Sequence, residues 1–558
     1  MRRTISLKIR WILFASIMSV AGGFCLAQGN QGQYEDLMKD RVENVTGQVV
    51  VISRSGEGQA RRLGIESTLP DGKKQRYWIW DDNKGRELIF RVGQNVEVQG
   101  ITNAGLNRTR SIRVRKYRIL GGNQQVANDE GEAGFRLSFL AGGLDPGGSF
   151  LGGTEIRALA AFDGKVFAGN GYWNELAEGT QDPYHGAQVL VLDRSDGLWR
   201  LDREFTMADG KTPELLGLSF LEPVTFVTDH RGEKLKSEVR VLTTGGFGRQ
   251  TLYLRESGKS DWIDTAPDKD ALKIGETPFG VETRCATGHT DKATGISHIF
   301  IGVTSGGIRK GGYDPALPGK IRWDEKAEYT GEGRAMGLAD CNGVLYASFG
   351  DKLLRRIDGK EPRWEVVYTD DPGNRTGGSA VRRAAFVSSP DGSETSIIFG
   401  VEGSKARTIR LDPNDRNKQT VELSMPEYFN PIRHGIIDYN GVTRTIDPSN
   451  GLEVGLMGLL MLGPAGFGGF YDWHEDGLLF WRTRDGQYHL NRIHDPTLAE
   501  MPPLVGVRQI VASPFENERN VFYFSGYDTV GHPVHNTGWI FKGHINSILK
   551  EYSREKIR

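Results

Sequence analysis

The sequence predicts an all-β fold made of many short antiparallel strands, and three observations support it. An arginine recurs ahead of a strand–turn–strand pattern about every 50 residues, as in Arg157 before ALAAFDGKVFAGNG and Arg334 before AMGLADCNGVLYASFG. Glycine accounts for 74 of the 558 residues, and without a collagen-like period these glycines indicate turns. Strand pairs whose second member carries a tryptophan form another recurring pattern. Hairpin repeats of this length predict a β-propeller.

The N-terminus has the features of a signal peptide covering residues 1–27. Its basic residues are Arg2, Arg3, Lys8 and Arg10. The apolar stretch from Trp11 to Phe24 is shorter than the roughly 20 residues of a membrane span. Cleavage after Ala27 would leave an exported chain, periplasmic or extracellular, without a membrane span. A lipid anchor on Cys25 is the alternative, and Phe24 argues against it because lipidation signals favour a small residue there.

Composition and pattern divide the mature chain into five further segments. They are a polar flexible lead-in (28–41), a five-stranded β unit (42–120), a polar linker (121–134), the repeat region (135–547) and a C-terminal tail (548–558). The β unit has alternating apolar and polar residues and GxxVxVxG late in its sequence. It resembles a small oligonucleotide/oligosaccharide-binding (OB) barrel of the bacterial periplasmic kind.

A basic stretch closes this unit, and two interpretations of it stay open. Its basic residues are Arg108, Arg110, Arg113, Arg115, Lys116 and Arg118. With Tyr77 on another strand, the stripe could bind an anionic glycan or nucleic acid. Nucleic acid is the less natural partner of an exported chain, so we expect none. The alternative is a solvated basic edge that prevents strand-to-strand aggregation.

We count seven hairpin starts, which predicts roughly seven blades. They lie near residues 157, 223, 284, 334, 383, 433 and 508. The copy near 223 lacks the leading arginine. The interval from 433 to 508 is long enough for an insertion, whose expected core is GLEVGLMGLLMLGPAGFGG. Trp199, Trp262 and Trp364 occupy equivalent places and are expected to pack between neighbouring blades.

These repeats resemble the broad β-propeller superfamily that includes the WD40, kelch and NHL types. They match none of its named subfamilies, since the Gly-His and Trp-Asp pairs, the kelch double glycine and the Asp-box are all missing. The resemblance implies the fold and a central channel. It implies no particular function, because members range from scaffolds to hydrolases and lyases.

The recurring arginines are the first candidate ligand-binding residues. They are Arg157, Arg284, Arg334, Arg383, Arg433 and Arg508. Because innermost strands line a propeller's channel, one position repeated on them should form a ring near one mouth. Such guanidinium groups could bind a carboxylate, phosphate or sulfate. Alternatively, each pairs with an acidic residue of its own blade, such as Glu155, Glu282 or Glu332, and joins adjacent blades.

The loops after the second strand of each hairpin are the other candidate site, expected at the opposite rim. First and last blades of a closed propeller are neighbours, so their loops should face each other. The candidate ligand-binding residues here are Asn170, Tyr172, Trp173 and Asn174 in the first loop and Tyr527, Asp528, His532 and His535 in the last. Aromatic, amide and acid groups suit a carbohydrate or a small polar ligand. The aromatics could equally plug the loops for structural reasons.

Several other kinds of site find little or no support in the sequence. The net charge of −1 gives no case for a nucleic-acid binder. No GxSxG elbow is present, and no GxG combination opens a helix as a nucleotide site requires. We predict no cofactor and no metal, since Gly531 and Pro533 deprive His532 and His535 of helical spacing. Cys285 and Cys341 either form a disulfide between adjacent blades or are two buried small side chains.

The expected function is therefore that of an exported binding or scaffolding protein. It would recognise a polar or anionic, glycan-like ligand, or a protein partner, at the propeller mouth. The alternative is a carbohydrate-active enzyme, either a hydrolase or a polysaccharide lyase. A lyase would use an arginine to neutralise a uronate carboxylate and a tyrosine or histidine as base. The sequence identifies no catalytic residue.

Overall fold

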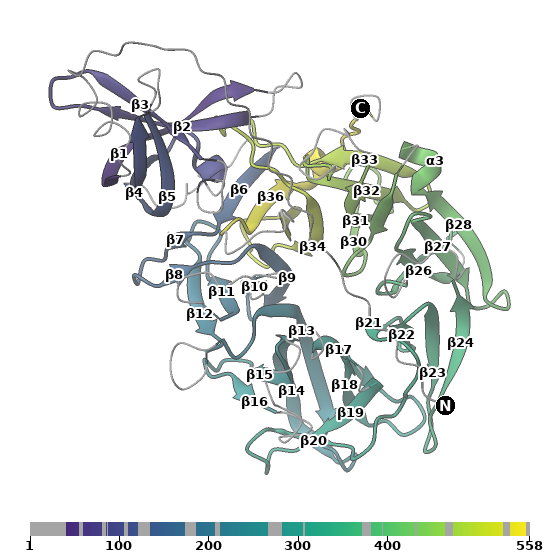
Figure 1. Cartoon of the computed structure of the whole chain (residues 1–558). Coiled ribbons are helices and arrows are strands. Elements are labelled where there is room, and N and C mark those ends of the chain that lie inside the picture. Colours follow the sequence, from purple (N-terminus) through teal and green to yellow (C-terminus); the bar gives the residue numbers. More distant parts are fainter. Residues whose placement is uncertain are drawn as a thin grey trace, which may run out of the picture.

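A computed structural model of the chain is almost entirely β, which confirms the all-β prediction (Figure 1). It describes residues 41–54, 60–80, 85, 88–104, 110–120, 134–172, 186–206, 213–265, 282–304, 307–370, 381–392, 394–429, 432–463, 473–527 and 536–553. The predicted signal peptide, nearly all of the lead-in and nearly all of the linker lie outside these residues. No helix among them is long and apolar enough to cross a membrane.

The N-terminal unit is a closed barrel of five strands in the order β1-β2-β3-β5-β4. The strands are β1 (Arg41–Arg54), β2 (Ala60–Thr68), β3 (Lys74–Ile79), β4 (Asn95–Ala104) and β5 (Arg110–Ile119), with a 3-10 turn η1 (Leu88–Arg91) before β4. β3 and β5 pair in parallel, and the other neighbours are antiparallel. Fully buried Val49, Ile65 and Val98 form part of its core.

The repeat region consists of seven antiparallel sheets, here called blades 1 to 7 in chain order. Blade 1 contains β9 (Glu155–Phe162), β10 (Lys165–Gly171), β11 (Gln188–Leu192) and β12 (Arg200–Glu204). Blade 2 contains β13 (Gly217–Thr228), β14 (Lys234–Phe247), β15 (Arg249–Glu256) and β16 (Ile263–Asp264). Blade 3 contains β17 (Thr283–Thr290), β18 (Ser297–Val303), β19 (Gly307–Tyr313) and β20 (Ile321–Trp323). Blade 4 contains β21 (Ala335–Asp340), β22 (Leu345–Phe349), β23 (Lys352–Ile357) and β24 (Arg363–Thr369).

The remaining blades complete the circle. Blade 5 contains β25 (Ala385–Ser388), β26 (Thr395–Val401), β27 (Arg407–Asp412) and β28 (Lys418–Ser424), followed by α3 (Met425–Phe429). Blade 6 contains β29 (His434–Ile437), β30 (Thr443–Ile446), β31 (Glu453–Leu462), β32 (Leu478–Thr483) and β33 (Tyr488–Arg492). Blade 7 contains β34 (Gly506–Ala512), β35 (Val521–Tyr527), β36 (Trp539–His544) and β6 (Phe135–Leu140). A small sheet of β7 (Gly143–Leu144) and β8 (Phe150–Leu151) precedes blade 1, and α4 (Ile545–Ile548) follows β36.

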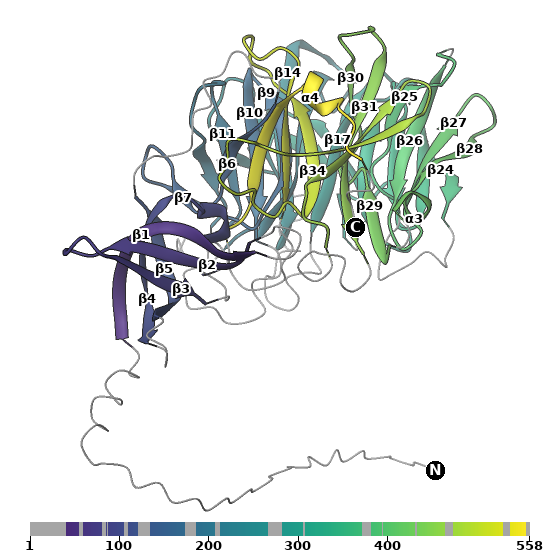
Figure 2. The same cartoon turned by 90° about the horizontal axis from the view of Figure 1, so that it is seen from above.

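The first strand of the repeat region closes the ring. β6 pairs antiparallel with β36 and so forms the outer strand of blade 7. Figure 1 shows the innermost strands β9, β13, β17, β21 and β34 around a common centre, and neighbouring ones are in contact. In the described part of the chain, six sheets of four strands and blade 6, whose inner strand is divided in two, are arranged radially and make a seven-bladed propeller, as predicted. Figure 2 gives the same arrangement from above.

Blade 6 differs from the sequence prediction. The stretch GLEVGLMGLLMLGPAGFGG was expected to be the core of an insertion. Its described part instead contains β31, the second strand of the blade, which pairs with both β29 and β30. The strand is buried on both faces and therefore lacks the polar–apolar alternation of its counterparts. The first strand of the blade is broken into β29 and β30.

Tryptophans link neighbouring blades, as the sequence predicted. Trp199 is fully buried beside Phe139 and Tyr523 of blade 7 and donates from its indole nitrogen to Ser138 (3.0 Å). Trp262 donates to Asp202 of blade 1 (2.8 Å), and Trp364 donates to Glu328, which follows blade 3 (3.1 Å). Each indole thus combines apolar burial with a specific bond to the preceding blade.

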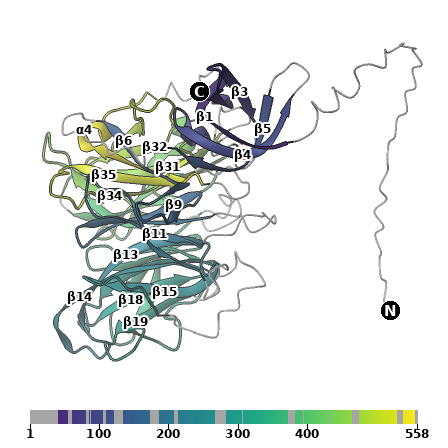
Figure 3. The same cartoon turned by 90° about the vertical axis from the view of Figure 1, so that its left-hand side faces the viewer.

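Two further observations settle points that the sequence left open. Cys285 and Cys341 are both free and buried, each among apolar side chains of its own cluster, so they form no disulfide. The barrel contacts the propeller: the buried Arg91 guanidinium donates to the Ala141 carbonyl, which follows β6. Figures 1 and 3 show the barrel beside the part of the ring where β6 and β36 meet.

Candidate functional site

A local irregularity of the innermost strands directs three arginines toward one another. Arg157 lies at a β-bulge between Ile156, opposite Asn170, and Ala158, opposite Gly169. Arg284 and Arg508 occupy the same bulge position in blades 3 and 7. A bulge re-aims the side chain of the extra residue. The repeated arginine therefore marks a repeated bulge at the start of the inner strand.

The fourth arginine of the predicted ring, Arg334, does not occupy the bulge position of its blade. In blade 4 the bulge falls at Met336, between Ala335 and Gly337. Arg334 lies two residues earlier along the strand, which places it nearer the mouth by about 7 Å of extended chain. Glu155 and Glu282 hold the corresponding position in blades 1 and 3. Blade 4 thus presents a cation where two other blades present an anion.

In blade 5 the arginine that joins this group is Arg382, where the sequence suggested Arg383. Arg382 is buried and its guanidinium pairs with Glu402. Arg383 makes two hydrogen bonds to Glu222 of blade 2, at 2.9 and 3.0 Å. Adjacent residues of an extended chain project to opposite sides, so only one of the pair can point toward this mouth. The prediction for Arg383 as a member of the ring was wrong.

The predicted acidic partners are only partly involved. Arg157 and Arg284 pair with the acidic residues of their own blades, Glu155 (3.1 Å) and Glu282 (3.2 Å). Arg508 pairs with Glu155 across the junction of blades 7 and 1 (2.9 Å). Glu332, the third expected partner, is exposed and forms no ion pair with Arg334. Of these three pairs, only Arg508 with Glu155 joins two blades.

A tyrosine that the sequence analysis did not single out lies among these arginines. Blade 6 interrupts its first strand at 438–442, where Asp438 has a left-handed backbone (φ 59°). Asn440 donates across the channel to the Arg157 carbonyl at 2.8 Å. Tyr439 between them is stacked by Arg508, 3.8 Å from its ring centroid, and by Arg382 at 4.2 Å. The Arg284 guanidinium approaches the Tyr439 hydroxyl at 3.4 Å.

We call this group the arginine cluster. It comprises Arg157, Arg284, Arg334, Arg382 and Arg508, with Glu155, Glu282, Glu402 and Tyr439. The only sequence signal for Tyr439 was the turn-forming run Asp-Tyr-Asn-Gly in the loosest copy of the repeat. That run indicates a break in the strand, and it does not tell which way the tyrosine points.

The electrostatics of the cluster favour negative charge. Burial would raise the pKa of Tyr439, but Arg508, Arg382, Arg284 and Arg157 lower it to about 7. Burial also raises the pKa of the neighbouring Asp438 carboxyl to about 8, so this group is largely protonated at neutral pH. Burial opposes ionisation of Glu402 too, yet Arg382 and His434 lower its pKa to about 2.

Burial and repulsion from neighbouring arginines lower the pKa of two arginines of the cluster. Burial, followed by repulsion from Arg508 and Arg284, lowers the pKa of Arg157 to about 10 despite its glutamate neighbours. Burial and the nearby Arg284 and Arg382 likewise lower the pKa of Arg334. Among the described residues the Arg334 guanidinium interacts with Glu282 and Tyr439 at coulombic range but has no hydrogen bond or ion pair, and the buried Nη1 of Arg157 has no hydrogen bond. In the described part of the chain, five arginines of the cluster thus face three glutamates.

Arg433, the remaining predicted arginine, does not belong to this cluster. It is exposed, and its Nε donates to the Gly463 carbonyl at 2.7 Å. The neighbouring His434 instead faces the cluster, through a 3.0 Å contact with Glu402. The prediction that Arg433 converges with the other arginines was therefore wrong.

The loop residues of the first and last blades meet as predicted, but at a different mouth. The Tyr172 hydroxyl donates to the Asn536 side chain at 3.1 Å. The pairing of Gly171 with Glu155 places this loop at the same end of the channel as the arginines. The expectation of opposite rims was wrong, because an antiparallel hairpin brings the end of its second strand beside the start of its first.

The other loop candidates divide into two groups. Asn170 is fully buried, and its side chain bonds the Gly152 carbonyl and Gln188, so it holds the loop together. The residues outside the described part of the chain are Trp173, Asn174, Asp528, His532 and His535. The backbone of Tyr527 ends β35 opposite Gly506 and Glu155; its side chain is also outside the described part.

Farther along the same strands the channel has a different character. A cavity of about 460 Å³ is lined there by inner-strand residues of several blades, including Leu159, Leu221, Phe386 and Val511. Its charged groups are matched, since Arg383 pairs with Glu222 and Arg444 pairs with Glu453. Nowhere in the described residues do three His, Cys, Asp or Glu side chains gather as metal ligands would.

Comparisons with known proteins give little beyond these observations. No protein-family model matches the chain, and no curated protein matches it. Among solved structures, YCF48 from Cyanidioschyzon merolae matches with a TM-score of 0.35 and 11% identity, over 74% of this chain and 99% of that chain. The assignment of the fold therefore rests on the strand pairing described above.

Proposed function

We propose that this chain is an exported binding protein that takes up a compact anionic ligand at the arginine cluster. The observation that carries the proposal is the surplus of positive charge. Buried like charges repel one another strongly, and a site that holds them is stabilised by a bound anion. Arg334 supports this reading most directly, because its guanidinium lies near the mouth without an ion-pair partner among the described residues.

The chemistry of the ligand follows from the donors. Guanidinium groups bind carboxylate, sulfate and phosphate oxygens through paired hydrogen bonds. Tyr172 and Asn536 at the same mouth could add neutral hydrogen bonds to hydroxyl groups. An acidic sugar combines both features, which agrees with the glycan-like ligand expected from the sequence.

Export and the nature of the barrel belong to the same proposal. The basic and apolar pattern of residues 1–27 supports cleavage and export. The strand order β1-β2-β3-β5-β4 with parallel β3 and β5 supports an OB-like barrel. Through the Arg91 contact the barrel would be held beside blade 7, where it could present a second surface to a glycan or a protein partner.

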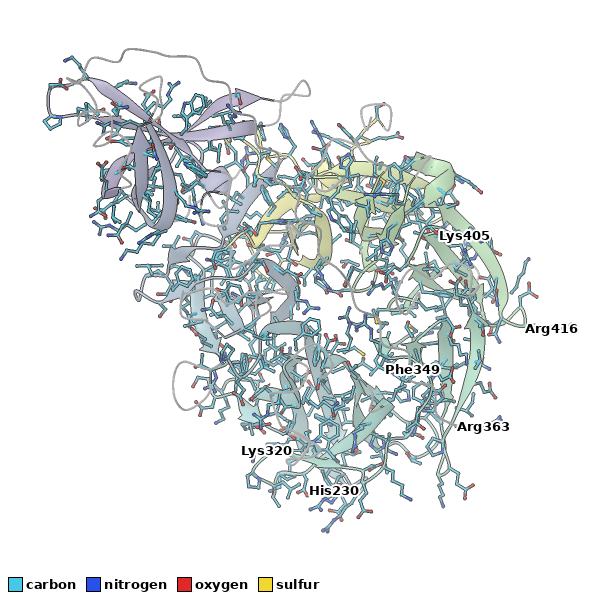
Figure 4. All side chains as sticks on the ribbon, viewed as in Figure 1. His230, Lys320, Phe349, Arg363, Lys405 and Arg416 are labelled. Atoms are coloured by element: carbon cyan, nitrogen blue, oxygen red, sulfur yellow. The ribbon has the colours of Figure 1, made fainter. Side chains whose placement is uncertain are left out.

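The test is a calorimetric titration of the mature protein with sulfate, phosphate, galacturonate and galactose. The proposal predicts binding of the acidic ligands and none of galactose. Arg334→Ala should weaken binding at least about tenfold, as expected when one charge-assisted pair is lost. Arg363→Ala is the matched control: it lies in the same blade, 70% exposed at the periphery of the ring (Figure 4). Equal affinities in the two variants would overturn the proposal.

A propeller lyase remains the second candidate, and Tyr439 favours it. An arginine beside a uronate carboxylate would stabilise the carbanion formed at C5, and a phenolate could accept the C5 proton. Incubation with acidic polysaccharides should then yield unsaturated oligosaccharides, and Tyr439→Phe should abolish them while binding persists. Binding without any depolymerisation would reject this candidate and leave the binding protein.

A further inference from the structure

The charge surplus of the arginine cluster also indicates the valence of its ligand. Asp438 is mostly protonated at neutral pH, so the anions of the cluster are Glu155, Glu282 and Glu402. Five arginines against three carboxylates leave two positive charges when Tyr439 is a neutral phenol. When Tyr439 is a phenolate, one positive charge is left. A ligand with two negative charges would therefore neutralise the cluster only if Tyr439 holds its proton.

Tyr439 is well placed to respond to such a ligand. Its ring lies between the guanidinium groups of Arg508 and Arg382, and its hydroxyl faces Arg284. A Tyr439 phenolate would be stabilised by the same arginines that would bind an anionic ligand. A bound anion adds negative charge next to this hydroxyl, which favours the protonated phenol.

We propose that the cluster selects a compact dianion over a monoanion and that Tyr439 takes up one proton when the dianion binds. This inference rests on the proposed anion-binding function and adds to it the charge of the ligand and the residue that senses it. No bond is made or broken; the proton comes from solvent and stays on the Tyr439 oxygen until the ligand leaves.

The other charged groups around Tyr439 do not supply this response. Among the described residues, the groups that face it are Arg157 from β9, Arg284 from β17, Arg334 ahead of β21, Arg382 ahead of β25 and Arg508 from β34. Each is a guanidinium that stays charged near neutral pH. The nearby arginines lower the pKa of Glu282 and of Glu402, so both stay ionised near neutral pH. On its own segment, burial raises the pKa of Asp438 to about 8, so this carboxyl stays mostly protonated up to about pH 7, and His434 contacts Glu402.

The experiment uses sulfate, a dianion whose charge is constant from about pH 6 to pH 9, and acetate as the monoanion. Wild type, Tyr439→Phe and Tyr329→Phe are titrated, the last as a control tyrosine that packs against Phe349 and Trp364 of blade 4. Ultraviolet absorbance follows tyrosinate, and calorimetry in buffers of different ionisation enthalpy counts the protons taken up. Circular dichroism verifies that each variant is folded.

At about pH 7, where Tyr439 is about half ionised and Asp438 is still mostly protonated, we expect sulfate to lower the tyrosinate signal and to bind with uptake of about half a proton. Its affinity should fall by about tenfold per pH unit above the Tyr439 pKa, as linkage requires for one proton. Acetate should bind at least about tenfold more weakly. In Tyr439→Phe the absorbance change should vanish, together with the proton uptake and the pH dependence between about pH 6 and pH 7, while binding at about pH 6 persists; Tyr329→Phe should behave as wild type.

Binding of sulfate without proton uptake, or a pH dependence that survives in Tyr439→Phe, would overturn this inference alone and leave the anion site standing. Equal affinity for acetate and sulfate would reject the selection of dianions. Failure of every anion to bind would reject the proposed function together with the inference. Should Tyr439→Phe not fold, Arg334→Ala gives the second test. It removes one positive charge, so sulfate should lose its advantage over acetate and the tyrosine should titrate at higher pH.

Discussion

The two halves of the propeller channel are built from the same inner strands, but their charged side chains are balanced in one half and unbalanced in the other. Around the 460 Å³ cavity each guanidinium has its carboxylate, as in Arg383 with Glu222 and Arg444 with Glu453. At the arginine cluster, cations outnumber anions, and Arg334 has no ion-pair partner among the described residues. Paired charges stabilise blade contacts, whereas an uncompensated surplus costs stability. The charge surplus therefore indicates that the arginine cluster is maintained for a reason other than the stability of the fold.

The largest effect should come from breaking a pair in the matched half. Arg383→Ala leaves Glu222 without its partner between blades 2 and 5, so we expect a loss of about 3 kcal/mol in the free energy of unfolding. The double variant Arg383→Met with Glu222→Leu should recover most of it. Urea denaturation measures both. Anion binding should survive in the double variant, and its loss there would mean that the two halves do not act separately.

A somewhat smaller effect concerns His289, which joins blades 3 and 4 behind this cavity. Its ring lies 2.7 Å from Asp340 and 3.0 Å from Asp358. Burial would lower the pKa of His289, but these carboxylates raise it above the ordinary 6.5. The charged ring therefore stabilises the fold fully below about pH 6.5, and this contribution is lost as pH rises through the raised pKa.

We expect His289→Gln to cost about 1–3 kcal/mol at pH 6, as for a buried group that loses its partners. The cost should shrink toward pH 9. Unfolding free energies measured across this range check the sign, and a cost that grows with pH would contradict the assignment. Tyr439 should show the reverse trend, because a lowered pKa makes its contribution grow as pH rises above about 7.

The smallest expected effect is a gain. Arg334→Ala removes an unpaired cation from the cluster, so the ligand-free protein should become more stable by about 0.5–2 kcal/mol at low salt. Wild type should recover this difference when sulfate is added, and the variant should not. Thermal unfolding with and without sulfate makes the comparison. A variant less stable than wild type without ligand would show that Arg334 has a structural role.

The sequence predicted the repeat and therefore most of the fold. Patterns that repeat in every blade predicted where the hairpins start and where Trp199 lies. They also predicted that the first and last blades are neighbours. It also identified Arg157, Arg284 and Arg508, because each occupies the same bulge.

Where a blade departs from the repeat, the sequence prediction failed for physical reasons. Nothing in a pair of adjacent arginines tells which one faces the mouth, so Arg383 was chosen over Arg382. β31, buried on both faces, lacks the alternation that marks a strand with one exposed face, and the break before β30 hid Tyr439. The fold does not test export or ligand binding, so both stay predictions.

The most direct test of the surplus charge needs no ligand. Tyrosinate absorbance of the free protein is followed from about pH 5 to pH 9, and the curve of Tyr439→Phe is subtracted from that of wild type. The account predicts one tyrosine that ionises at about pH 7, with a midpoint that moves upward when Arg334 is replaced by alanine. A difference curve that stays flat up to pH 9 would contradict it.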